Sequence, residues 1–184
     1  MATSPTCAKC GRGCDPYGDH AVSCIKAGLV RRHYDVVNEI RALLTSAGVE
    51  TQEEVVLAPE VRVDLVAKKF EFGCDVAYDV TVAHPLTTRP NIAAASCAEM
   101  LKINKYSDAC AHWGQKIYPL SFDSFGGMGK KSHKALSAII AKAATSHPIS
   151  VTAANLLWER VSLALMKAVA RQLLLSFPIQ IASC

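Results

Sequence analysis

Two neighbouring stretches of the sequence alternate apolar with polar residues, and each carries an aspartate at a polar position. Apolar residues stand at every second position from 61 to 67 and again from 76 to 82. Such alternation, with many β-branched side chains, is typical of strands that are buried on one face. Lys68-Lys69 and Glu71-Phe72-Gly73 lie between the two stretches and predict a hairpin loop with glycine at the bend. The sequence therefore predicts a β-hairpin whose strands carry Asp64 and Asp79.

We expect Asp64 and Asp79 to lie on one face of the two strands. Two carboxylates that are brought together in a sheet raise each other's pKa unless a cation lies between them. A hard divalent ion with oxygen ligands would satisfy both acids. The alternative is that each aspartate is a solvated residue on the polar face of an antiparallel sheet, and composition alone favours that alternative.

Length and composition limit the class of protein. The chain has 184 residues, of which 51% are hydrophobic, so it fits one domain with a sizeable core. It has no apolar run of about 18 residues, so we expect no membrane span. The first residues lack the basic and apolar regions of a signal peptide, and none is expected. The net charge of +4 permits nucleic acid as a partner without requiring it.

A cluster of potential metal ligands lies near the start of the chain. Cys7 and Cys10 form a Cys-x2-Cys pair, and His20 and Cys24 form a His-x3-Cys pair that we expect at the start of a helix. Thiolates and one imidazole at these spacings suit tetrahedral zinc, whereas disulfides or free thiols are the alternative. Cys14 is a spare that could replace Cys7 or Cys10. A site with four protein ligands has no open position, so zinc is predicted to be structural.

The rest of the pattern predicts four helices and two further strands. We expect amphipathic helices at 25–47, 91–113, 130–144 and 151–175, and strands at 51–58 and 116–122. The predicted fold class is α/β, a small mixed sheet flanked by helices with an N-terminal zinc knuckle. We assign residues 1–25 to the knuckle, 26–150 to the core, and 151–184 to a C-terminal amphipathic helix packed on the core.

Basic residues near two helix starts are candidates for contacts with nucleic-acid phosphates, although solvated surface is the alternative. They are Arg31, Arg32, Lys130 and Lys131. The glycine-rich run at 125–132 has some likeness to a phosphate-binding loop. However, Ser124 stands at the position of the first glycine, and Lys131 stands where serine or threonine should follow the lysine. We therefore reject a nucleotide triphosphatase.

Several motifs, taken in order, resemble the restriction-like endonuclease domain of site-specific non-LTR retrotransposons. They are Cys-x2-Cys-Gly, Asp-Pro-Tyr-Gly-Asp-His-Ala-Val-Ser-Cys, Arg-Arg-His, Arg-Val-Asp, Asp-Val-Thr-Val with His-Pro-Leu, Lys-x2-Lys-Tyr, and Trp-Glu-Arg-Val-Ser. The resemblance spans residues 7–175. Each motif alone is weak, but the ordered set is fairly specific.

This resemblance implies a nuclease fold of the PD-(D/E)xK class, with Asp64 and Asp79 as catalytic residues that bind magnesium or manganese. Such families place a lysine two residues after the second acid, and this chain has Thr81 there. The resemblance suggests that Lys102 or Lys105 of the following helix supplies the amine instead.

The family also pairs its site with an upstream glutamate, which we place on Glu54 rather than Glu39. Val63 stands where proline commonly precedes the first aspartate. This departure has little effect on the expected activity, because the aspartate carboxylate, and not the residue before it, carries out the chemistry.

The function that the resemblance implies is nicking of double-stranded target DNA in the nucleus for retrotransposon integration by target-primed reverse transcription. Element RNA is a further expected partner, and the domain is normally fused to a reverse transcriptase. This chain has no polymerase part, so we expect an excised domain, a truncated copy or a descendant with a separate life. Thr81 supports an alternative, a catalytically decayed zinc-containing module that binds nucleic acid. A third hypothesis is an interaction protein that docks through its apolar C-terminal helix.

Overall fold

A four-stranded sheet with the order β1-β2-β3-β4 forms the centre of the structure. This computed structural model describes residues 5–85, 93–114, 116–145 and 151–177. β1 pairs with β2 and β2 with β3 in antiparallel fashion, whereas β3 and β4 are parallel, so the sheet is mixed. The strands are β1 (Thr51–Ala58), β2 (Val61–Glu71), β3 (Cys74–Ala83) and β4 (Lys116–Asp123).

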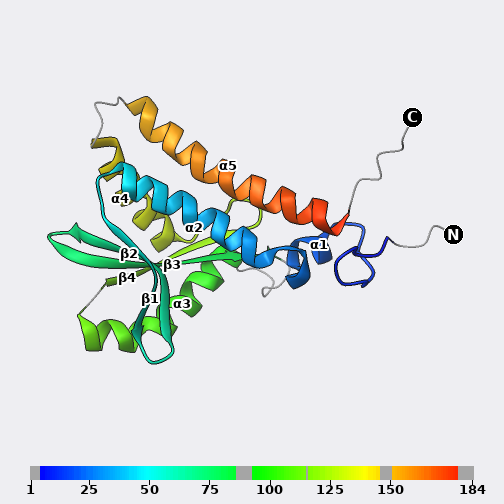
Figure 1. Ribbon diagram of the computed structural model, residues 1–184, viewed down its shortest axis with the longest axis horizontal. Helices are drawn as coiled ribbons and strands as arrows, with labels where there is room; N and C mark the ends of the chain where they lie inside the picture. Colours follow the sequence, from blue (N-terminus) through cyan, green and yellow to red (C-terminus); the bar gives the residue numbers. More distant parts are fainter. Residues whose placement is uncertain (1–4, 86–92, 115, 146–150, 178–184) are drawn as a thin grey trace.

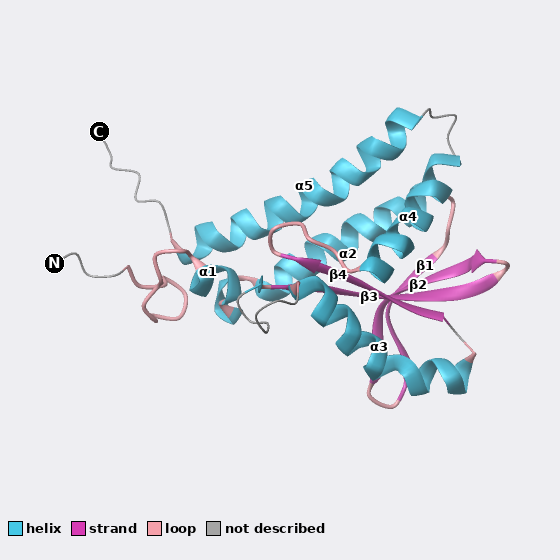
Figure 2. Cartoon of the chain, turned by 180° about the vertical axis from the view of Figure 1, so that it is seen from behind, coloured by secondary structure: helices cyan, strands magenta, loops and turns pink. Residues whose placement is uncertain are grey.

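Helices cover both faces of this sheet. α2, α4 and α5 lie on one side, and α3 lies on the other (Figures 1 and 2). The predicted α/β class, with a small mixed sheet flanked by helices, is confirmed. The helical elements are α1 (Asp19–Ser23), the 3-10 turn η1 (Ile25–Ala27), α2 (Leu29–Ser46), α3 (Ala94–Trp113), α4 (Lys130–Thr145) and α5 (Val151–Ser176). The helix start expected at residue 91 lies outside the described residues. So do residues 1–4, 146–150 and 178–184, which belong to the ends of the predicted knuckle, core and C-terminal segment.

The alternation in β2 and β3 divides their side chains between two apolar clusters. Leu65, Tyr78 and Val80 are buried in the larger cluster, with residues of α2, α4 and α5. Val66 and Ala77 point to the other face and pack with Tyr106 of α3. Burying one large aliphatic side chain contributes about 1.5–3 kcal/mol, so both faces of these strands stabilise the sheet.

Two predicted boundaries differ from the structure. The helix expected at 25–47 is interrupted at Gly28, whose φ of 94° separates η1 from α2. Such a left-handed conformation suits glycine and does not continue a helix. Lys68 and Lys69 belong to β2 rather than to the hairpin loop, which is shortened to Phe72 and Gly73. Lys69 has a positive φ of 51°, and the β2–β3 register shifts there, which indicates a bulge.

α5 packs along α2 through one of its faces. Val161, Leu165 and Val169 of α5 are buried in the larger cluster. The opposite face carries exposed apolar residues, among them Leu163 and Met166. Within the described residues, no helix combines the length and the apolar character needed to cross a membrane.

The start of α4 is fixed by a buried acid from α3. The Glu99 carboxylate accepts hydrogen bonds from the backbone N–H groups of Lys131 and Ser132, at 3.2 and 2.7 Å, and from the Ser132 hydroxyl at 2.7 Å. A carboxylate here satisfies N–H groups that the helix itself leaves unpaired. It also occupies the position at which a phosphate-binding loop would hold its anion, which agrees with the rejection of a nucleotide triphosphatase.

We expect Gly129→Ala to lower the free energy of unfolding by about 1–3 kcal/mol. A Cβ at this position would lie 2.3 Å from a Glu99 carboxylate oxygen, and the three hydrogen bonds restrain that carboxylate. Urea unfolding of the variant measures the loss. Gly13→Ala is the control, because a Cβ there meets nothing within 4 Å. Equal unfolding midpoints for both variants would contradict this account.

Candidate functional site

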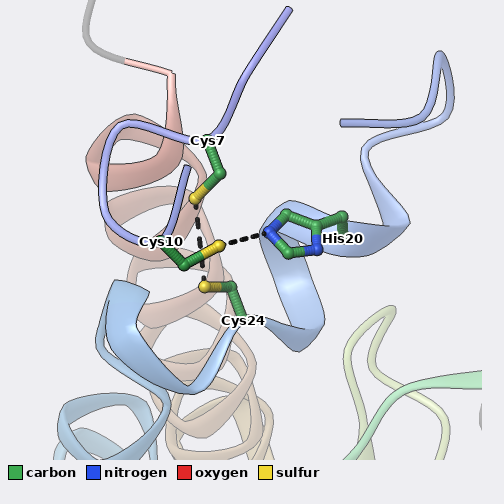
Figure 3. A group of neighbouring side chains, drawn as sticks. All are labelled: Cys7, Cys10, His20 and Cys24. Carbon is green, nitrogen blue, oxygen red and sulfur yellow. Dashed lines mark hydrogen bonds between the residues drawn. The ribbon is translucent and has the colours of Figure 1, made fainter. Parts of the chain in front are cut away.

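The four predicted zinc ligands come together at one point. Cys7, Cys10, His20 and Cys24 offer ligand atoms that all lie within 4.8 Å of one another (Figure 3). Cys10 Sγ lies 3.1 Å from His20 Nε2, and the Cys7 and Cys24 sulfurs are 3.9 Å apart. Tetrahedral zinc with bonds of about 2.3 Å to sulfur spaces two thiolates by about 3.8 Å. The cluster therefore has the donor set and the spacing to hold a zinc ion.

Local backbone structure holds these ligands in place. Cys7 and Cys10 lie on a tight turn, where Gly11 N–H donates to the Cys7 carbonyl at 2.8 Å. His20 lies in α1, whose start is capped by Asp15 through bonds from the N–H groups of Asp19 and His20. These backbone donors, that of His20 foremost, lower the pKa of the Asp15 carboxyl to about 2. The sequence analysis assigned no role to Asp15, although Asp-Pro-Tyr-Gly is a typical turn sequence.

Cys7 of the cluster and Cys14 beside it differ in their environment. Burial opposes ionisation of Cys7, but the backbone N–H groups of Lys9 and Cys10, with His20, lower its pKa to about 6. Burial raises the pKa of the Cys14 thiol, and the nearby Cys7 adds to this effect. Cys14 does not belong to the four-ligand group. It therefore does not replace Cys7 or Cys10, the alternative that the sequence left open.

Buried polar side chains attach the knuckle to the core. The Arg32 guanidinium donates to the carbonyls of Val22 and Val82, each at 3.0 Å. Gln172 of α5 donates to the same Val22 carbonyl at 2.8 Å. His84 lies 3.2 Å from Asp19 of α1 and 3.0 Å from the Ser124 hydroxyl. These contacts link α1 to α2, α5 and the ends of β3 and β4.

The prediction that Arg32 contacts phosphate is therefore wrong. Only 2% of Arg32 is exposed, and its burial lowers the pKa of the guanidinium. Sequence pattern did not reveal this role, because an arginine beside another arginine at a helix start usually indicates a solvated surface. Arg31, in contrast, is exposed, as are Lys130 and Lys131 at the start of α4.

The acidic residues form a row across three strands. The β2–β3 pairs end at Leu65 opposite Tyr78, and Asp64 and Asp79 are the next residues of the two strands. In the β1–β2 register, Glu53 lies opposite Leu65 and Val55 opposite Val63, so Glu54 lies opposite Asp64. Because side chains alternate between faces, both aspartates lie on the α3 face with Val66 and Ala77. That Asp64 and Asp79 lie close enough to share a cation stays a prediction.

Asp79 is the most buried member of the row and is held by two residues of α3. Its Oδ1 accepts a hydrogen bond of 2.6 Å from the Tyr106 hydroxyl. Its Oδ2 lies 2.6 Å from Lys102 Nζ, an ion pair without the alignment of a hydrogen bond. Burial, followed by the charge of Asp79, raises the pKa of Tyr106 above its ordinary range, so the phenol stays a donor.

Asp64 contacts α2 rather than α3. Its Oδ1 lies 3.1 Å from His33 Nε2, and its Oδ2 accepts a 2.6 Å hydrogen bond from the Val80 N–H. The second contact joins the aspartate side chain to the neighbouring strand and fixes its direction. The sequence analysis did not assign His33 to the site, although a histidine at the edge of an apolar helix stripe was the available signal.

Glu54 completes the outer end of the row. Its Oε1 accepts a 2.5 Å hydrogen bond from the Tyr34 hydroxyl and lies 2.6 Å from the Arg62 guanidinium. The Tyr34 hydroxyl, foremost, lowers the pKa of the Glu54 carboxyl. Glu54 has a φ of 51°, a conformation that non-glycine residues adopt at a cost of about 1–3 kcal/mol. Glu39, the other candidate glutamate, pairs with Arg160 at 2.8 Å.

The two candidate lysines lie in different places. Lys102 contacts Asp79, whereas Lys105 Nζ lies 5.1 Å from the centre of the Tyr106 ring and is exposed. The geometry therefore favours Lys102 over Lys105 as the amine of the acidic row.

The arrangement combines carboxylate oxygens, the half-buried ammonium of Lys102 and the imidazole of His33. In the described part of the chain, three or more metal-binding side chains come within 4.8 Å only at the cysteine–histidine cluster. Asp64 and Asp79 do not belong to that group. Comparison of the sequence with protein-family models and with curated proteins finds no match.

We expect Cys10→Ser to lower the zinc content of the purified protein and its melting temperature. The variant replaces a soft thiolate with a poor zinc ligand, and metal binding is coupled to folding of the knuckle. Zinc analysis by plasma mass spectrometry together with thermal unfolding measures both effects. Cys74→Ser is the control, because Cys74 is an exposed cysteine of β3 outside the cluster. Equal zinc content in both variants would rule out the assigned ligand set.

Arg32→Ala is expected to destabilise the fold by about 1–3 kcal/mol, because it leaves the Val82 carbonyl without this donor and leaves the buried Val22 carbonyl with Gln172 alone. Chemical denaturation compares it with Arg31→Ala, which removes the same charge from the exposed neighbouring position. The prediction fails if both variants unfold at the same denaturant concentration.

Proposed function

We propose that this chain is a metal-dependent endonuclease that nicks double-stranded DNA. Its core would be of the restriction-like PD-(D/E)xK class, as in the site-specific non-LTR retrotransposons that the sequence resembles. One observation carries the proposal: Asp64 and Asp79 are the next residues beyond the last β2–β3 pair, Leu65 with Tyr78, and Lys102 is held at Asp79. Structural aspartates on the polar face of a sheet would instead point to solvent, whereas only 4% of Asp79 is exposed.

Asp64 and Asp79 are the residues that would hold magnesium or manganese. Their donors are carboxylate oxygens, which hard divalent cations prefer. Asp79 Oδ2 is buried and lies 2.6 Å from Lys102 Nζ, so an ion at this oxygen would displace the ammonium. When bound, such an ion polarises a scissile phosphate and lowers the pKa of an attacking water.

The protein groups around the pair have roles of their own. Tyr106 donates to Asp79 and so fixes the direction of that carboxylate, while the Val80 N–H does the same for Asp64. The Lys102 ammonium would stabilise the negative charge that develops on the phosphate as the bond to the leaving oxygen breaks. In this role Lys102 of α3 supplies the amine that the nuclease class places two residues after the second acid. Thr81 of β3 stands at that position here and has no amine.

Exposed basic residues would bind the DNA backbone. Arg31, Lys105, Lys130 and Lys131 are exposed. Contacts of this kind release counterions, so DNA binding should weaken as salt rises. The integration of a retrotransposon, target-primed reverse transcription, element RNA as a partner and a nuclear location belong to this proposal through the resemblance alone.

A second candidate is a decayed nuclease that binds nucleic acid through its zinc knuckle. Two observations favour it: Thr81 stands where the nuclease class places its lysine, and Lys102 with Tyr106 satisfies Asp79 without a metal. Such a module would bind DNA equally well with and without magnesium.

We expect purified protein to nick supercoiled plasmid with magnesium or manganese, and we expect Asp64→Ala and Asp79→Ala to abolish nicking while retaining DNA binding. Each variant removes one of the two carboxylates. Gel analysis of relaxed circles measures nicking, and a mobility shift measures binding. Asp75→Asn is the control, since Asp75 lies on β3 but pairs with Lys68. Full activity of either alanine variant would refute the catalytic assignment.

Lys102→Ala should reduce the nicking rate by about 10²-fold, which is the usual cost of losing one group that stabilises developing charge. Lys105→Ala should change it little, because Lys105 contacts the Tyr106 ring and no carboxylate of the row. Single-turnover rates of plasmid nicking, measured for both variants, distinguish the roles of the two lysines. The reverse order of effects would transfer the role to Lys105.

A further inference from the structure

A cleft lies on the side of the sheet away from the acid pair. It has a volume of about 380 Å³ and lies between the loop after β4, the start of α4 and the middle of α5. Its walls include Phe122, Met128, His133, Trp158 and Leu165. Pockets for small ligands occupy about 300–1,000 Å³, so one planar ring system fits this space.

Two aromatic rings form one wall of the cleft. His133 of α4 and Trp158 of α5 are stacked, with ring centres 4.9 Å apart and planes 24° from parallel. Trp158 is half-buried and His133 is exposed, so this stack reaches from the apolar cluster to solvent. An aromatic ring system that enters the cleft can extend the stack.

Positive charge borders the cleft on the α4 side. Lys130 lies three residues before His133 and so neighbours the imidazole on the helix surface, whereas Lys131 and Lys134 lie on adjoining parts of the same helix turn. Lys130, Lys131 and Lys134 are all exposed, and none has an acidic partner among the described residues. Two acidic residues are also near: Glu159 follows Trp158 in α5, and Asp123 accepts hydrogen bonds from the Phe125 and Gly127 N–H groups in the loop that lines the cleft.

We infer that this cleft binds an unpaired nucleobase of a single-stranded nucleic acid, with the base against the His133–Trp158 stack and the flanking phosphates on Lys130, Lys131 and Lys134. Aromatic stacking beside a basic surface is the general mode by which proteins bind single strands. An aromatic side chain of a protein partner would use the stack equally well. The three unpaired lysines favour the polyanion.

The cleft and the acid pair are separate. Asp79 is held by Tyr106 and Lys102 of α3, whereas α4 and α5 lie on the opposite side of the sheet (Figure 2). The inference stands whether or not the acid pair cleaves DNA.

The test measures binding by tryptophan fluorescence. The chain has two tryptophans, Trp113 and Trp158. A Trp113→Phe protein therefore reports on Trp158 alone. Oligonucleotides of about 12 nucleotides, oligo(dT) and oligo(U), are titrated in buffer without magnesium or manganese, so that no strand is cut. We expect either strand to quench Trp158 emission, and the stronger of the two identifies DNA or RNA as the ligand.

Variants then separate stacking from charge. His133→Ala should weaken binding by about tenfold, because it removes one side of the stack. We expect a smaller salt dependence when Lys130, Lys131 and Lys134 are replaced with glutamine. The slope of log K against log salt concentration should become less negative by about 0.7 per lysine. Lys167→Gln, which removes an exposed lysine of α5 elsewhere, should change neither. Circular dichroism checks that each variant is folded.

The opposing results are equally clear. Unchanged Trp158 emission at saturating oligonucleotide would overturn the inference and assign the cleft to a peptide or to no ligand. Equal affinity of His133→Ala and its parent would do the same, because binding would then not involve the stack. Tighter binding of a duplex than of single strands would show that the lysines bind phosphate without a base in the cleft.

Discussion

The register between β2 and β3 determines which side chains meet at the centre of this molecule. With Leu65 opposite Tyr78, both residues enter the larger apolar cluster, and the aspartates that follow in the alternation, Asp64 and Asp79, belong to the other face. A shift of one residue would exchange the two faces and place the aspartates in the apolar interior. The burial of Leu65, Tyr78 and Val80 therefore fixes the position of the acids as firmly as it fixes the sheet.

A second constraint is the way in which the knuckle is attached. Arg32 and Gln172 converge on the Val22 carbonyl, and His84 reaches Asp19. A buried guanidinium is costly to desolvate, so these hydrogen bonds are needed to offset its burial. Arg32 precedes His33, which contacts Asp64. The first turn of α2 therefore touches both the knuckle and the acid row, and we expect loss of the metal to affect the row through this turn.

The sequence could predict what depends on local spacing. The period-2 pattern located the hairpin and its two aspartates, and the Cys-x2-Cys and His-x3-Cys spacings located the four ligands of the cluster. It could not predict contacts that depend on how elements pack. Arg32 looks like surface in sequence and is buried, and Glu99 looks like an exposed helix acid and caps α4. Lys102 and Lys105 were equivalent by spacing, and only the position of α3 on the sheet distinguishes them.

The most direct test of the central claim is to locate the metal. Crystals of the protein soaked in manganese, with data collected at the manganese absorption edge, show bound ions as anomalous peaks. The account predicts a peak about 2.1 Å from carboxylate oxygens of both Asp64 and Asp79, with Lys102 moved away from Asp79 Oδ2. Ordered carboxylates with no peak between them, and Lys102 still paired with Asp79, would contradict it and leave a protein that binds nucleic acid without cutting it.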